Sequence, residues 1–203
     1  MNLDRFIASH LSAPKDISGR IVSFFMSRRN RPIYKKTISI LNISDGDNVL
    51  DIGCGNGYVL NIIAKHHKGN FAGIDKSESI IKAAKSRNRQ FIKNGIMEFC
   101  CQDLSRMSFE DGFFDKVYTI NTIYFWESLD DTFREINRVL KPNGIFINTV
   151  LSNETLDRFS FTKHGYKRFS EERLTGAGSA AGFQVKVNSI FRGFAYCYEF
   201  KKI

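Results

Sequence analysis

The sequence contains no long apolar run, and this absence limits where the chain can work. None of its hydrophobic stretches approaches the length that a helix needs to span a bilayer. Residues 1–6 also lack the apolar segment of a signal peptide. We therefore expect a cytoplasmic protein with no membrane span. The 203 residues, 42% hydrophobic and 25% charged, are typical of one soluble domain with a sizeable core.

Cysteine is scarce, and its spacing argues against a zinc site. The four cysteines show no C-x-x-C pair, and three of them fall in predicted strands or in a glycine turn. They are Cys54, Cys100, Cys101 and Cys197. We expect reduced, mostly buried side chains rather than disulfides or metal ligands, and we predict no bound metal. The sequence shows no internal repeat and no low-complexity linker.

Acidic residues are in the minority, with 21 against 30 basic residues and a net charge of +9. In the first forty residues the only acids are Asp4 and Asp16. The basic residues there are Arg5, Lys15, Arg20, Arg28, Arg29, Arg31, Lys35 and Lys36. Basic surfaces attract nucleic acid, but solvated basic faces of helices are also common. Nucleic-acid binding therefore remains an alternative rather than the preferred interpretation.

The rest of the sequence can be arranged around residues 48–57. Val49, Leu50 and Ile52 form a short apolar run between polar residues and glycines, which predicts a buried strand. Apolar positions recur at helical spacing over residues 58–67, so the glycines lie where the strand turns into a helix. Glycine accepts positive φ, and a helix start offers free N–H donors. The turn is therefore a candidate cradle for a nucleotide or an anion.

The spacing of the glycines argues against a dinucleotide. Tyr58 occupies the position of the third glycine in a G-x-G-x-x-G turn. The run is instead Gly53-x-Gly55-x-Gly57, with Asp51 two places before it. This stretch resembles motif I of the class I S-adenosylmethionine-dependent methyltransferases. A tight strand-to-helix turn without any ligand is the alternative interpretation.

Two further acids follow predicted strands. Asp75 ends the strand predicted at residues 70–75, where an acid can accept both hydroxyls of a ribose, although it can also cap the next helix. Asp103 follows the strand predicted at 97–101 and resembles the family acid that accepts a hydrogen bond from the adenine amino group. By the same resemblance, the N–H of Leu104 addresses a ring nitrogen. A simple turn aspartate is the alternative for Asp103.

The resemblance covers roughly residues 45 to 200 and includes the turn Leu140-Lys141-Pro142-x-Gly144. It implies S-adenosylmethionine as cofactor, S-adenosylhomocysteine as product, and a character similar to quinone-biosynthesis and other small-molecule methyltransferases. The implied cofactor residues are Asp51, Gly53, Cys54, Gly55, Asn56, Gly57, Asp75, Lys76, Gln102, Asp103, Leu104 and Asn121.

The implied fold is α/β: a single Rossmann-like, doubly wound sheet of seven strands in the order 3-2-1-4-5-7-6, with the last strand antiparallel. Residues 1–44 are predicted to form an N-terminal helical lid within the same domain, and residues 45–203 the methyltransferase core. We predict helices near 3–11, from 17, and at 33–41, 77–94, 129–140 and 170–181. We predict further strands at 113–120, 145–150, 183–190 and 194–200, and an irregular loop at 151–169.

The acceptor is less well indicated. The sequence lacks the N-P-P-Y run of enzymes that methylate exocyclic amino groups of nucleobases. In related enzymes an N-terminal segment often covers the active site, and ring residues flank the methyl group. The candidate pocket residues are Met26, Arg29, Asn30, Tyr34, Tyr124, Trp126 and Tyr166, each of which could also be plain packing. A general base is optional for some acceptors, and the candidates are Tyr124 and His164.

Three functions remain open at this point. The preferred one is methyl transfer to a small-molecule acceptor by in-line displacement, in a monomer or homodimer. The second is an RNA or protein methyltransferase that uses the basic N-terminal segment. The third is a non-enzymatic protein that only binds the cofactor. The sequence does not identify the acceptor or the methylated atom.

Overall fold

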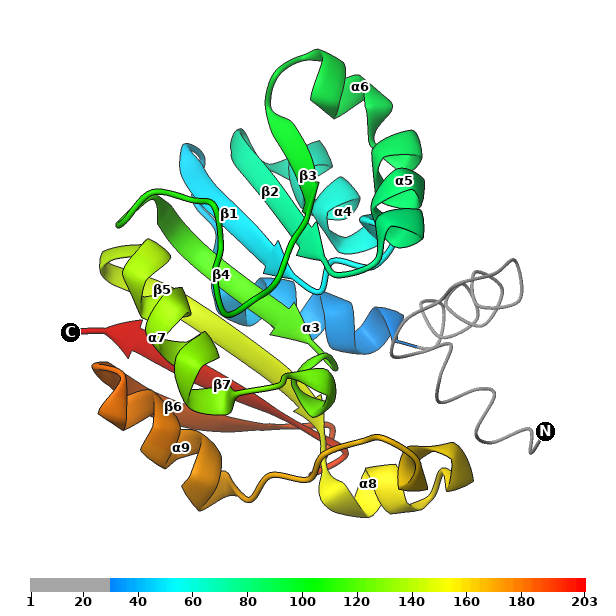
Figure 1. The fold of residues 1–203 in the computed structure, drawn as a ribbon, viewed down its shortest axis with the longest axis vertical. Helices are drawn as coiled ribbons and strands as arrows, with labels where there is room; N and C mark the ends of the chain where they lie inside the picture. The colour runs from blue at the N-terminus through cyan, green and yellow to red at the C-terminus, as the bar shows by residue number, and fades with distance from the viewer. Residues whose placement is uncertain (1–29) are drawn as a thin grey trace.

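The computed structural model describes residues 30–203, which form a seven-stranded sheet flanked by helices (Figure 1). The strand order is β3-β2-β1-β4-β5-β7-β6. The strands are β1 (Asp47–Ile52), β2 (Gly69–Asp75), β3 (Met97–Cys101), β4 (Phe114–Ile120), β5 (Leu140–Leu151), β6 (Phe183–Ile190) and β7 (Ala195–Lys202). Strands β1 to β5 are parallel, and β7 runs antiparallel to both β5 and β6. The predicted fold class and strand order are confirmed.

Helices cover both faces of the sheet. The described helices are α3 (Arg31–Leu41), α4 (Tyr58–His66), α5 (Glu78–Arg87), α6 (Arg89–Lys93), α7 (Leu129–Val139), α8 (Asn153–Asp157) and α9 (Glu171–Ala180). Two short 3-10 helices are η1 (Ile123–Phe125) and η2 (Ser160–Lys163). Apolar side chains of α7 and α9 form one buried core with the sheet, and those of α3, α4 and α5 form the other.

Helix α7 shows how the local sequence determines an element. Ser128 Oγ accepts a hydrogen bond from the N–H of Asp131 and thereby caps the helix. Phe133 and Ile136 are fully buried, and they recur at the three- to four-residue spacing of a helix face. Phe133 packs edge-on against Phe200 of β7, with ring centroids 4.9 Å apart. This contact packs α7 against β7.

The helix predicted at 77–94 is wrong as a single element, because it breaks at Asn88. The Asn88 side chain donates to the carbonyl oxygens of Gly57 (3.2 Å) and Ala84 (3.0 Å) and accepts a hydrogen bond from Asn61 (2.9 Å). An asparagine that bonds backbone groups competes with the helix ladder. Asn88 therefore ends α5, and α6 begins at the next residue.

The segment at 151–169 is also more ordered than predicted. Ser152 caps α8 by accepting a hydrogen bond from the N–H of Thr155 (3.2 Å). The hydroxyl of Thr162 donates to the carbonyl of Leu156 (2.7 Å), which joins η2 to α8. Helices of four or five residues are too short to show an apolar period, so the sequence pattern could not reveal them.

Strand β5 begins earlier than predicted and contains the Lys141-Pro142-Asn143-Gly144 turn. Its pairing with β4 is irregular there, because Phe114 faces Leu140 whereas Lys116 faces Ile145. Asn143 has a φ of 63°. The turn therefore lies within β5 and shifts the pairing of β5 with β4, instead of preceding the strand.

Helix α3 packs beside β4 and β5, and the hydroxyl of Thr37 donates to that of Thr149 (2.9 Å). The predicted helices at 3–11 and from 17 lie outside the described residues, and the lid of residues 1–44 stays a prediction. Across residues 30–203, no helix is both long and apolar enough to cross a membrane. All four cysteines lie in this part of the chain and are free; Cys54 and Cys197 are buried and Cys101 is exposed.

Candidate active site

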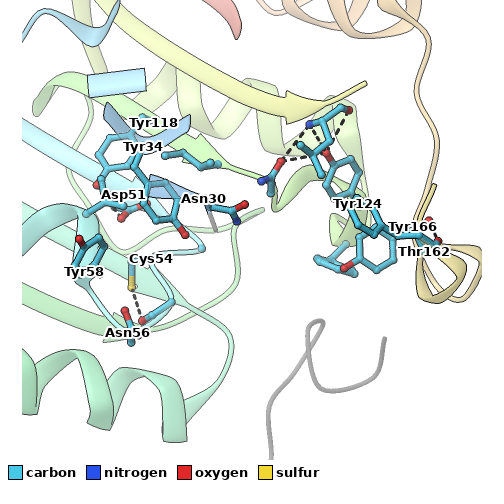
Figure 2. A pocket seen from close by; sticks show the side chains of 18 of the residues that line it. Asn30, Tyr34, Asp51, Cys54, Asn56, Tyr58, Tyr118, Tyr124, Thr162 and Tyr166 are labelled. Carbon is cyan, nitrogen blue, oxygen red and sulfur yellow. Dashed lines mark hydrogen bonds between the residues drawn. The ribbon is translucent and has the colours of Figure 1, made fainter. Parts of the chain in front are cut away.

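A cavity of about 270 Å³ lies at the carboxyl ends of β1 and β4, and its lining has two halves. One half is the glycine turn with Asp51 and its tyrosine neighbours, and the other is a group of aromatic rings. Figure 2 shows Asp51, Tyr34 and Tyr118 close together on one side and Tyr124 and Tyr166 on the other. The lining residues are Asn30, Tyr34, Asp51, Gly53, Cys54, Gly55, Asn56, Tyr58, Val59, Tyr118, Ile120, Asn121, Tyr124, Phe125, Leu151, Phe159, Phe161, Thr162, Tyr166 and Phe194.

The glycine turn presents bare backbone to this cavity. Gly53, Gly55 and Gly57 have φ values of 69°, 52° and 67°, in the left-handed region that favours glycine. A Cβ at Gly53 would lie 2.5 Å from the Cγ2 of Thr122, whereas a Cβ at Gly55 would meet no atom within 4 Å. Gly57 is the N-cap of α4 and has no side chain to satisfy the first N–H groups. The turn is thus shaped for a ligand that lies against main chain.

Asp51 is the only acidic residue among the described residues that line the cavity. Its side chain is 4% exposed, and one carboxylate oxygen accepts a hydrogen bond of 2.8 Å from Tyr118 Oη. Burial raises the pKa of Asp51 to about 7; the hydrogen bond from Tyr118 opposes this rise and the charge of Asp75 adds to it. No Lys, Arg or His lines the cavity among the described residues. Within residues 30–203, the carboxylate of Asp51 therefore has no cationic partner in the cavity lining.

Asp75 supports the glycine turn from the end of β2. Its carboxylate accepts hydrogen bonds from the N–H of Gly55 (3.3 Å) and of Ser77 (3.0 Å). Burial raises the pKa of Asp75, and these hydrogen bonds oppose the rise. Asp75 is outside the cavity lining but only one hydrogen bond from Gly55. The structure therefore brings Asp51, Asp75 and the glycine turn to one edge of the sheet.

The predicted residues after β3 lie outside the cavity lining. Asp103 is exposed and accepts hydrogen bonds from the N–H (2.7 Å) and hydroxyl (2.6 Å) of Ser105, which lower the pKa of Asp103. The side-chain oxygen of Gln102 accepts from Ser108, while its buried amide nitrogen has no partner among the described residues. Lys76 and Leu104 flank this region without reaching the lining. Their roles toward a cofactor stay predictions.

Aromatic rings form the second half of the cavity, and Tyr166 lies at their centre. Its ring centroid is 5.3 Å from that of Tyr124, 4.7 Å from that of Phe125 and 6.1 Å from that of Phe161. Burial raises the pKa of Tyr166, and no described group hydrogen-bonds its hydroxyl. This half therefore offers apolar ring surface together with the Tyr166 hydroxyl, which has no hydrogen-bond partner within residues 30–203.

The two candidate bases have environments poorly suited to proton abstraction. Tyr124 Oη accepts a hydrogen bond from the N–H of Leu151 (2.8 Å) and lies 3.3 Å from the side-chain oxygen of Asn121. Burial raises the pKa of Tyr124 far above its ordinary value, which keeps the phenol neutral. His164 follows η2 and is not part of the cavity lining. Tyr124 is therefore a wall residue by its geometry.

The remaining predicted pocket residues separate into three groups. Asn30 and Tyr34 line the cavity, whereas Met26 and Arg29 lie outside the described residues. Trp126 is 2% exposed and is not in the lining. Its indole N–H donates to the hydroxyl of Thr122 (3.3 Å), and its ring stacks at 6.4 Å from that of Phe146 in the core. The structure thus places Trp126 behind the cavity rather than at its surface.

Sequence reasoning missed several lining residues. Tyr118 faces Asp51 directly in the pairing of β4 with β1, so a correct register would have revealed it. The other missed residues are Tyr58, Val59, Ile120, Phe125, Leu151, Phe159, Phe161, Thr162 and Phe194. Phe159, Phe161 and Thr162 lie in the segment without periodicity, and Phe194 lies in the β6–β7 turn, so only the folded chain brings them together.

Known proteins share parts of this sequence. A family model described as a methyltransferase domain matches residues 50–148. The chain is 30% identical over 125 residues to the uncharacterized methyltransferase YdaC of Bacillus subtilis, which covers 61% of this chain and 67% of that protein. It is 32% identical over 145 residues to the sterol 24-C-methyltransferase ERG6 of Saccharomyces cerevisiae, which covers 71% of this chain and 37% of that protein. The chain thus spans little more than a third of the length of that sterol methyltransferase.

Solved structures share the fold at low sequence identity. A chain of the complex between the Haloferax volcanii Trm112 methyltransferase activator and the putative methyltransferase matches with a TM-score of 0.78 and 22% identity, over 88% of this chain and 92% of that chain. The geranyl diphosphate C-methyltransferase of Streptomyces coelicolor matches with a TM-score of 0.73 and 12% identity, over 93% of this chain and 86% of that chain. These likenesses concern the architecture.

Proposed function

This chain belongs to the class I S-adenosylmethionine-dependent methyltransferases, and on that premise we propose that it transfers a methyl group to a small, mainly apolar acceptor. One observation carries the proposal. A single cavity joins the glycine turn and Asp51 to a half lined by aromatic rings that has no charged side chain among the described residues. Such a lining favours an acceptor held by apolar contact rather than by ion pairs.

In our proposal the amino-acid end of the cofactor occupies the half of the cavity that contains the glycine turn. Gly55 leaves space where any other residue would place a Cβ, and Asp51 offers a carboxylate with no cation beside it in the part of the lining that the structure describes. In our proposal Asp51 holds the ammonium group of S-adenosylmethionine, and the glycine backbone lies against its amino-acid end. Asp75 would accept the ribose hydroxyls, and Asp103 with the N–H of Leu104 would address the adenine. When bound, S-adenosylmethionine supplies a methyl group already activated by its sulfonium.

The residues of the chain contribute mainly by positioning. We call the half of the cavity that contains the glycine turn and Asp51 the cofactor half, and the half lined by aromatic rings the acceptor half. The ring cluster around Tyr166 holds the acceptor in contact with the cofactor half and excludes water from the cavity. Holding two reactants in line can supply roughly 7–11 kcal/mol of the barrier in favourable cases. Because the hydroxyl of Tyr124 is engaged by the main chain, we assign it a wall role and propose that no protein base is needed.

The apolar acceptor is also in keeping with the relatives. Several of them are named as sterol carbon methyltransferases, and a structural neighbour is named as a geranyl diphosphate C-methyltransferase. We therefore propose an acceptor with an apolar body of the sterol or prenyl kind as the first class to test. The alternative of RNA or protein methylation depends on the basic N-terminal segment, most of which lies outside the described residues.

Two measurements test this proposal. Calorimetry should detect S-adenosylhomocysteine binding to the parent chain, and Asp75→Ala should weaken it at least tenfold because the ribose contact and the support of Gly55 are both lost. The exposed acid Glu110, changed to Ala, is the matched control and should bind like the parent. A chain that binds no S-adenosylhomocysteine would contradict the cofactor assignment.

The acceptor class needs a separate assay. Transfer of labelled methyl groups from S-adenosylmethionine should be detected with a sterol or a prenyl alcohol, and not with tRNA or a basic peptide. Transfer to tRNA that weakens steeply with salt would instead favour the nucleic-acid alternative.

A further inference from the structure

Asp51 and Tyr118 form a buried, hydrogen-bonded pair in the lining of the cofactor half. The two residues are direct partners in the pairing of β1 with β4, and Tyr118 Oη donates to the carboxylate at 2.8 Å. Both line the cavity, and their exposed fractions are only 4% and 1%. A buried carboxylate usually has a cation beside it, yet within residues 30–203 the partner of this one is a neutral phenol.

The described groups near Asp51 that come from other elements do not supply positive charge. Asp75 comes from β2, Tyr34 from α3, Tyr58 from α4 and Cys54 from the glycine turn. Burial raises the pKa of Tyr34 to about 12, so this phenol is neutral at physiological pH. The hydrogen bond from Tyr118 is therefore the main interaction in the described chain that favours ionised Asp51.

We propose that Tyr118 is a positioning residue that aims the Asp51 carboxylate into the cavity and stabilises the ionised form that the cofactor's ammonium group requires. This inference rests on the proposed function, because it assumes that the cofactor half binds the amino-acid end of S-adenosylmethionine. Binding then couples to a proton. The protonated Asp51 releases its proton to solvent as the ligand enters, the ligand keeps its ammonium proton, and no covalent bond changes.

The coupling predicts a pH dependence of binding. Since burial raises the pKa of Asp51 to about 7, half of the free protein holds the proton at that pH. Affinity for S-adenosylhomocysteine should therefore be about tenfold lower at pH 6 than at pH 8. Removing the phenol in Tyr118→Phe raises the pKa of Asp51 further, so the midpoint of the binding profile should move to higher pH.

The experiment is calorimetric titration of the full chain with S-adenosylhomocysteine between pH 5.5 and 8.5. Tyr118→Phe should show the upward shift of the midpoint, with the loss of affinity largest below pH 7. Tyr196→Phe is the matched control, because it removes a phenol on β7 that is not part of this cavity lining and has no hydrogen bond to Asp51 among the described residues. Its midpoint should equal that of the parent. 5′-Methylthioadenosine, which lacks the amino-acid end, should bind the parent and Tyr118→Phe equally at every pH.

The outcomes separate this inference from the function on which it rests. If the parent binds neither ligand, the proposed cofactor is wrong. If the parent binds S-adenosylhomocysteine but Tyr118→Phe keeps the parent's midpoint, the role of Tyr118 is wrong. Should Tyr118→Phe fail to fold, Asp51→Asn gives the second test: its residual binding should no longer change between pH 6 and pH 8, and a persisting dependence would overturn the inference.

Discussion

At the scale of single residues, the buried carboxylate of Asp51 serves cofactor binding in our proposal, but its ionised form lowers the stability of the folded chain. The pKa of Asp51 is raised from 3.8 to about 7 in the folded chain, mainly by burial. At pH values between 3.8 and about 7, Asp51 is therefore protonated in the folded state but ionised in the unfolded state. The contribution of Asp51 to stability is therefore fully present below about pH 4 and is lost as the pH rises through 7.

We predict that Asp51→Asn stabilises the unliganded chain at high pH. The amide keeps an oxygen that can accept from Tyr118 but carries no charge to bury. The gain in the free energy of unfolding should reach up to about 4 kcal/mol at pH 8 and be clearly smaller at pH 5. Urea unfolding of parent and variant at both pH values measures this difference. An equal gain at the two pH values would show that the charge is not its cause.

The residues in the cofactor half of the cavity were predictable because the sequence pattern that marks them is local. Asp51 and the three glycines lie within seven positions, and the physical need for positive φ shows directly in the choice of glycine. Tyr118 is 67 positions from Asp51, so its role depends on how two strands pair. Contacts made by pairing and by irregular loops leave no periodic trace in a single sequence.

At the scale of elements, the break between α5 and α6 connects a helix to the glycine turn. Asn88 is 1% exposed, and its amide joins Gly57, Asn61 and Ala84. The helical pattern of the sequence continues past Asn88, and for this reason the sequence predicts a single helix at 77–94. The tertiary hydrogen bonds of one asparagine outweigh the local preference.

We predict that Asn88→Ala destabilises the chain and weakens cofactor binding together. Losing a buried amide leaves the carbonyl of Gly57 without this partner, at a cost of about 1–3 kcal/mol. Thermal unfolding and S-adenosylhomocysteine titration should both show the effect. Asn94→Ala, at the exposed end of α6, is the control and should change neither. Full stability of Asn88→Ala would mean that the break has another cause.

Two glycines of α9 should respond in opposite directions to alanine. A Cβ at Gly178 would lie 2.5 Å from Cδ1 of Phe200, whereas a Cβ at Gly176 would meet no atom within 4 Å. Gly176→Ala should stabilise by about 0.5–1 kcal/mol through helix propensity, and Gly178→Ala should destabilise by about 1–3 kcal/mol through overpacking. Denaturant midpoints of the two variants check the sign, and an equal response would contradict the packing of α9 on β7.

At the scale of the whole molecule, ligand binding should appear as thermal stabilisation. A ligand that binds only the folded chain, at a concentration of 100 times its Kd, adds about 2.7 kcal/mol to the free energy of unfolding. For a chain of this size, S-adenosylhomocysteine should raise Tm by roughly 5–10 °C. NAD should not raise it, because Tyr58 replaces the third glycine of the dinucleotide turn. A shift with NAD alone would overturn the cofactor assignment.

The fold as a whole was more predictable than its acceptor half. The strand order came from a family resemblance carried by Asp51, the glycines and the turn at Leu140–Gly144, and the sheet has that order. The acceptor half draws residues from η1, the α8–η2 segment and the β6–β7 turn, and none of these segments contains one of those markers. A shared scaffold therefore does not determine what the cavity accepts.

The position of β7 has a consequence for synthesis of the chain. Residues 195–202 come last among the strands but lie between β5 and β6. During translation β6 emerges first and has no neighbour to pair with, and the outer side of β5 stays open until the ribosome has released these residues. Phe194, which lines the cavity, directly precedes these residues. Until residues 195–202 have emerged from the ribosome, the nascent polypeptide carries an unclosed sheet edge, which leaves backbone groups of β5 open to pairing with another chain.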